Sequence, residues 1–93
     1  MGVPEEFPKV LIVDDNKENI DLIAYFLKPQ NYQIFTALDG YEALEIVERD
    51  EPDIILLDIM LPKMDGFQVC ERIKKDRKTQ FIPIIMILSL IHI

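Results

Sequence analysis

The sequence is poor in several residue types, and each shortage excludes a class of protein. Among its 93 residues there is one cysteine, Cys70, so no disulfide can form within the chain, as suits a reducing compartment. Only 10 residues are basic against 17 acidic ones, and the net charge of -7 disfavours direct contact with nucleic acid or an anionic membrane, because phosphate binding needs basic surfaces. The same charge suits a divalent cation or a basic protein surface.

Long hydrophobic runs are also missing. The longest apolar stretch, at residues 82–93, is shorter than the ~20 residues that a membrane-spanning helix needs. The first eight residues are acidic and polar and lack the apolar segment of a secretory signal. We therefore expect a cytoplasmic protein with no membrane partner, folded as a single domain over residues 1–93, toward the small end of what folds alone.

What the sequence does contain is an alternation of short aliphatic runs and longer amphipathic stretches. This pattern indicates right-handed βαβ crossovers and an α/β fold with a parallel sheet. Asn16 is expected to cap the first helix, and Phe67, Cys70 and Ile73 to face inward from the third. Strands are predicted at 9–13, 32–37, 53–57 and 83–88, and helices at 17–27, 41–49 and 66–75.

Three acidic side chains fall where two of the predicted strands end. Asp14 and Asp15 follow the first strand directly, and Asp58 follows the third. If those strands are neighbours, the three carboxylates converge at the carboxyl edge of the sheet, where open α/β folds bind ligands. At ~5 Å and an effective dielectric constant near 20, each like-charge pair costs roughly 3 kcal/mol. Carboxylates without a nearby histidine or further cysteine favour a hard cation, Mg²⁺ before Zn²⁺.

These residues carry a family resemblance. The Asp14-Asp15 pair, Asp58, and the segment DIMLPKMDG over 58–66 together resemble the receiver domain of two-component response regulators. The resemblance covers about residues 8–87 and leaves 88–93 as an atypical tail. It implies a flavodoxin-like, doubly wound parallel sheet with strand order 2-1-3-4, in which the fifth strand and the last helices of the family are missing.

The resemblance also implies roles for the acidic residues. Asp58 would be the phosphoacceptor, taking a phosphoryl group from the phosphohistidine of a sensor histidine kinase or phosphotransfer protein. Asp15 would bind Mg²⁺ directly, Asp14 mainly through water, and the backbone carbonyl of Met60 would complete the protein ligands. Gly66 would permit the tight return of the loop after Asp58.

The sequence departs from the receiver pattern near its end. The family's switch hydroxyl falls at Leu88, Ser89 comes one residue late, and the lysine of the fifth strand is absent. The last residues, LSLIHI, suggest a truncated or frame-shifted end. We expect the apolar fourth strand to have an exposed edge, so that the chain is either a marginal monomer or is rescued by strand exchange into a dimer.

Two alternatives remain beside the phosphoacceptor reading. The first, favoured by Leu88 and the missing lysine, is a protein-interaction module that does not switch, or a non-functional truncated fragment. The second is a metal-dependent phosphohydrolase, which is disfavoured because Met60 replaces the second acid of the D-x-D motif; we expect no enzyme. His92, the single histidine, lies outside any motif and is rejected as a metal ligand.

Overall fold

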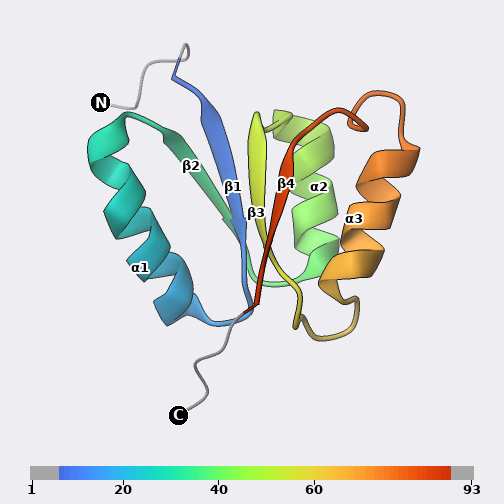
Figure 1. The fold of residues 1–93 in the computed structure, drawn as a ribbon, viewed down its shortest axis with the longest axis horizontal. Coiled ribbons are helices and arrows are strands. Elements are labelled where there is room, and N and C mark those ends of the chain that lie inside the picture. The colour runs from blue at the N-terminus through green and yellow to red at the C-terminus, as the bar shows by residue number, and fades with distance from the viewer. Residues whose placement is uncertain (1–6, 89–93) are drawn as a thin grey trace.

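The computed structural model describes residues 7–88, in which four parallel strands form one sheet between two layers of helices. Figure 1 shows α1 on one face of the sheet and α2 and α3 on the other. The strand order is β2-β1-β3-β4, so the predicted α/β fold and its 2-1-3-4 order are confirmed. The strands are β1 (Lys9–Val13), β2 (Gln33–Ala37), β3 (Ile54–Asp58) and β4 (Ile84–Ile87), and the helices α1 (Lys17–Leu27), η1 (Lys28–Gln30, a 3-10 turn), α2 (Gly40–Asp50) and α3 (Gly66–Lys75).

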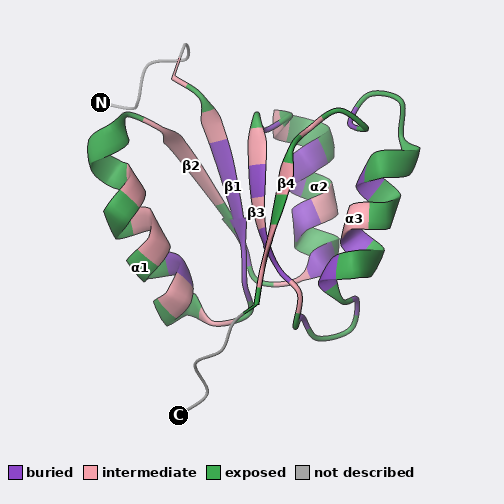
Figure 2. Ribbon diagram, viewed as in Figure 1, coloured by how far each residue is buried: buried purple, intermediate pink, exposed green. Residues whose placement is uncertain are grey.

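The central strands divide the apolar residues between two cores because successive side chains point to opposite faces. Leu11 and Val13 of β1 pack toward α2 and α3, together with Ile55 of β3. Val10 and Ile12 join Ile20 of α1 on the other face. Both faces of β1 are therefore buried, as the unbroken aliphatic run predicted (Figure 2).

Each of the three α-helices begins at a capping side chain. Asn16 accepts hydrogen bonds from the Glu18 and Asn19 amides, which confirms its predicted capping role. Asp39 caps α2, and Asp65 caps α3 through a reciprocal pair of bonds with Gln68. All three caps lie in loops that follow the carboxyl ends of strands, so they fix these loops where the acidic residues gather.

One prediction about the third helix is wrong. Phe67 was expected to face inward, but it is 63% exposed, and the buried residues of α3 are Gly66, Val69 and Ile73. The glycine at the start of the helix packs against the sheet, and this turns the next residue outward. Cys70 is half-buried against the core, as expected.

Candidate metal centre

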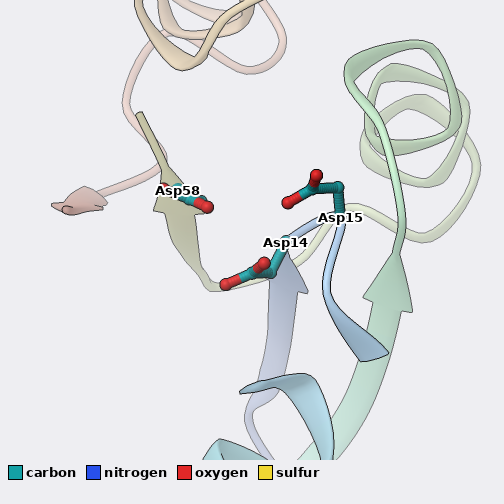
Figure 3. Close-up of side chains that lie close together, drawn as sticks. All are labelled: Asp14, Asp15 and Asp58. Atoms are coloured by element: carbon teal, nitrogen blue, oxygen red, sulfur yellow. The ribbon is translucent and has the colours of Figure 1, made fainter. Parts of the chain in front are cut away.

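The strand register brings the three acidic residues together. Val13 of β1 pairs with Leu57 of β3, so the residues that follow them, Asp14 and Asp58, lie across from each other at the carboxyl edge of the sheet. Asp15 comes next in the chain, and one oxygen from each of the three carboxylates lies within 4.8 Å of the others (Figure 3). The predicted convergence is therefore present.

Asp14 is the most constrained of the three carboxylates. It is 4% exposed, its Oδ1 accepts a hydrogen bond from the Asn16 amide at 2.9 Å, and its Oδ2 accepts one from Asn19 Nδ2 at 3.3 Å. Burial raises the pKa of Asp14, and the Asp58 and Asp15 carboxylates raise it further, while the two hydrogen bonds lower it. The surroundings of Asp14 thus disfavour its ionised form, and a cation at the site would stabilise that form.

Asp58 is buried at the end of β3, with 2% of its surface exposed. Its Oδ1 accepts a hydrogen bond from the Met60 amide at 3.0 Å. The next residue, Ile59, donates its amide to the Ile87 carbonyl of β4 at 3.0 Å. Asp58 is therefore fixed through its side chain and through the pairing of the next residue with β4, whereas Asp15 is exposed to solvent.

The loop after Asp58 returns tightly under the acidic cluster. The Gly66 amide donates to the Ile59 carbonyl at 3.0 Å, and Lys63 adopts a left-handed backbone with φ 66°. A Cβ atom at Gly66 would lie 2.5 Å from the Asp58 carbonyl oxygen and 2.8 Å from Ile59 Cα. The glycine is needed for this close approach of two backbones rather than for an unusual φ.

The donor set fits a hard divalent cation. The cluster offers carboxylate oxygens only, with no nitrogen or sulfur ligand, which is the chemistry of Mg²⁺ sites. Within the described part of the chain, no backbone N–H donates to the Met60 carbonyl oxygen. An incompletely filled Mg²⁺ site keeps waters that a phosphoryl oxygen can replace.

The end of β4 borders this cluster and carries no hydroxyl among the described residues. Ile87 pairs with Asp58, and Leu88, which follows it, is 51% exposed. Ser89 and His92 lie outside the described residues.

Sequence reasoning missed Asn19, the side chain that contacts Asp14.

A cleft of about 350 Å³ between α2 and α3, lined among others by Val47, Glu48 and Arg72, includes none of the three acidic residues. No helix within residues 7–88 is long and apolar enough to cross a membrane.

Comparison with known proteins places this site in a family context. A family model described as the response regulator receiver domain matches residues 10–90. The response regulator PleD of Caulobacter vibrioides is 46% identical over 82 residues, covering 88% of this chain and 18% of PleD. The DNA-binding transcriptional regulator RpaA of Synechocystis is 40% identical over 83 residues, covering 89% of this chain and 34% of RpaA. The chain thus spans about a third or less of the length of these relatives.

Solved structures give the same result. The N-terminal domain of a response regulator receiver protein from Methanoculleus marisnigri superimposes with a TM-score of 0.81 at 41% identity, over 84% of this chain and 63% of the other. The receiver domain of a sensor histidine kinase from Pseudomonas aeruginosa, with a magnesium ion coordinated in its active site cleft, superimposes with a TM-score of 0.81 at 31% identity, over 86% of this chain and 66% of the other.

Proposed function

This chain belongs to the response regulator receiver domain family, and we propose from that membership that Asp58 is its phosphoacceptor in a two-component phosphorelay. The observation that carries the proposal is the convergence of Asp14, Asp15 and Asp58 within 4.8 Å at the carboxyl edge of the sheet. We treat residues 1–93 as one partial receiver unit. Receiver domains are generally not enzymes, and we propose that this one takes up a phosphoryl group without turnover of a substrate.

In the proposed reaction Asp58 is the nucleophile. A bond forms between an Asp58 carboxylate oxygen and phosphorus, while the bond from phosphorus to the donor nitrogen breaks and the donor imidazole keeps the electron pair. The Met60 amide holds Oδ1 of Asp58 at 3.0 Å and leaves the second oxygen available for attack. Burial of Asp58 removes competing water from the carboxylate.

Three carboxylates and a phosphoryl group cannot share this site without a counter-charge. We propose that Asp15, Asp58 and the Met60 carbonyl bind Mg²⁺ directly and that Asp14 acts mainly through water. Asp15 suits direct binding because it is exposed, whereas both Asp14 oxygens already accept hydrogen bonds. When bound, Mg²⁺ offsets the charge of the transferring group.

The partner that fits this site is a sensor histidine kinase or a phosphotransfer protein in the cytoplasm. The net charge of -7 argues against direct nucleic acid contact by this domain. The observation that favours the alternative, a module that binds partners without switching, is Leu88, which presents an aliphatic side chain where the family has a hydroxyl. That residue bears on the response to phosphorylation rather than on acceptance of the phosphoryl group.

We further propose that β4 pairs two copies of this chain through its outer edge. Pro83 and Ile87 direct their carbonyls to β3, so by alternation Ile84 and Met86 direct their backbone groups away from the sheet. The strand Ile84–Ile87 carries no charged side chain that would block pairing.

The phosphoacceptor proposal is tested by incubating the chain with acetyl phosphate and Mg²⁺ and measuring the intact mass. We expect one phosphoryl group on the wild type and none on Asp58→Asn, because the amide is a poor nucleophile. The matched control is Asp39→Asn, since asparagine caps a helix about as well as aspartate and this variant keeps the acidic cluster. A labelled Asp58→Asn variant, or an unlabelled wild type with an intact fold, would contradict the proposal.

A further inference from the structure

The acidic cluster has a neutral neighbour to which the proposed reaction gives no role. Asn19 lies in the first turn of α1, and its Nδ2 is 3.3 Å from Oδ2 of Asp14. On the other side of the same carboxylate, the Asn16 amide is 2.9 Å from Oδ1. Asp14 is thus held at both oxygens by donors from the start of one helix.

The local sequence fixes where Asn19 can reach. Asn16 caps the helix, so Asn19 is the third helical residue, and its backbone amide bonds to the Asn16 carbonyl at 3.1 Å and to Asn16 Oδ1 at 3.4 Å. These backbone bonds do not involve the Asn19 side chain. A substitution at Asn19 therefore leaves the helix cap in place and removes the side-chain contact with Asp14.

The chemistry of the pair decides how the Asn19 amide is oriented. An ionised carboxylate only accepts hydrogen bonds, so the NH₂ group of the amide, rather than its oxygen, has to face Asp14. At 3.3 Å this bond is longer than the commonest N–H to oxygen distance, and its effect comes from acting together with the Asn16 amide. With both donors present, the carboxylate cannot rotate away from its like-charged neighbours.

We infer that Asn19 is a positioning residue, whose amide holds the Asp14 carboxylate toward Asp15 and Asp58 before the cation binds. The inference rests on the proposed function, because it assumes that the three carboxylates bind Mg²⁺. Without this contact, repulsion from Asp58 favours Asp14 rotamers that point away from the cluster, and Mg²⁺ then has to bring the carboxylate back. The expected consequence is weaker cation binding, with no direct effect on attack by Asp58.

The test is a pair of variants, Asn19→Leu and Asn19→Ala. Both remove the hydrogen-bond donor, and only the alanine variant also reduces the side-chain volume. Direct Mg²⁺ titration, followed by amide NMR shifts or calorimetry, is expected to give a dissociation constant about tenfold higher than that of the wild type, the usual effect of removing a residue that orients a metal ligand. The rate of labelling by acetyl phosphate at saturating Mg²⁺ is expected to stay near that of the wild type. Leucine and alanine are better helix formers than asparagine, so the fold should persist in metal-free buffer.

The matched control is Gln80→Leu, which replaces an exposed amide in the loop between α3 and β4, at the opposite edge of the sheet. It should leave the Mg²⁺ dissociation constant unchanged. Unchanged Mg²⁺ affinity in both Asn19 variants would overturn the inference and leave Asp58 labelling, and so the proposed function, intact. Loss of the folded spectrum in both variants would also overturn it, in favour of a purely structural role. A wild type that binds no Mg²⁺ would overturn the inference and the cation site together.

Discussion

Asp14, Asp15 and Asp58 are one residue type in three environments, and their differences follow from which strand or loop holds each. Asp14 is buried and bonded to the first turn of α1, Asp58 is buried and bonded to the following loop, and Asp15 is exposed. Asp14 and Asp58 provide two negative charges in fixed positions, while the exposed Asp15 side chain can change its rotamer when an ion binds. A site of this kind gains affinity from the two carboxylates that need no rearrangement.

At this scale the pKa of Asp14 predicts a pH dependence of stability in metal-free buffer. Burial raises that pKa in the folded state, so the stability that Asp14 contributes is full below the unfolded pKa and is lost as pH rises through the folded one. Asp14→Asn removes this loss. We expect the variant to be more stable than the wild type near neutral pH, with an advantage that shrinks on acidification toward pH ~4.

Urea unfolding at several pH values, with a chelator present, measures this difference. Saturating Mg²⁺ should reduce or reverse the stability advantage of Asp14→Asn over the wild type at neutral pH, because only the wild type has the full set of carboxylates. A difference in unfolding free energy that is the same at all pH values would show that Asp14 titrates normally.

At the scale of elements, the loop between β3 and α3 connects Asp58, the proposed phosphoacceptor, to the helix layer formed by α2 and α3. Its return depends on Gly66, which lies against the backbone of Asp58 and Ile59. Gly40, at the start of α2, is a useful comparison, because a Cβ there would meet the Val69 side chain at 2.7 Å and Met64 of the same loop at 3.2 Å. Gly66 thus lies against the end of the acceptor strand, whereas Gly40 lies against α3 and the far end of the loop.

Gly66→Ala is expected to lower the unfolding free energy by about 1–3 kcal/mol, as overpacking usually does. It is also expected to weaken Mg²⁺ binding, since the backbone has to shift beneath Asp58 and Met60. The matched change Gly40→Ala should also lower stability, but with a smaller effect on Mg²⁺ affinity, because its Cβ would contact Val69 and Met64 rather than the backbone of Asp58. Thermal unfolding and Mg²⁺ titration of both variants provide the comparison, and equal Mg²⁺ affinities would refute the link between the loop and the site.

At the scale of the whole molecule, β1 is buried on both faces, whereas β3 is buried toward α2 and α3 and half-buried toward α1. The two outer strands are less covered. β4 is an outer strand, and Ile85 on it is 49% exposed. Within residues 7–88 no strand pairs with its outer edge, and this edge together with the apolar side chains of β4 can accept another strand.

We expect the chain to form dimers at micromolar concentrations and Ile85→Lys to shift it to the monomer, because a charged side chain on an edge strand opposes pairing with another strand. Sedimentation velocity over a concentration series measures this. Phe81→Lys is the control, since Phe81 is more exposed but lies in the loop before the strand. If both lysine variants dissociate the dimer equally, general hydrophobic association rather than pairing at β4 is responsible.

Much of this architecture could be predicted because it depends on local patterns. The aliphatic runs, and Asn16 before the first helix, predicted the strands and α-helices to within a residue or two. Asp14, Asp15 and Asp58 were found because parallel strands end at a common edge. The orientation of Phe67 was missed because helical periodicity was counted without the close approach of Gly66 to the sheet. The contact from Asn19 was missed because it depends on how the helix is placed against the preceding loop, which composition does not encode.

The register of β1 against β3 also has a consequence for the order of events in folding. Asp14 and Asp58 are far apart in sequence and come together only when Val13 pairs with Leu57. Their mutual repulsion is therefore absent from early, locally structured states and arises when the long-range pairing completes. Mg²⁺, which needs the assembled edge, can act only from that point on. Its effect should then fall mainly on the rate of unfolding, so the ion would lengthen the lifetime of the native chain without speeding its formation.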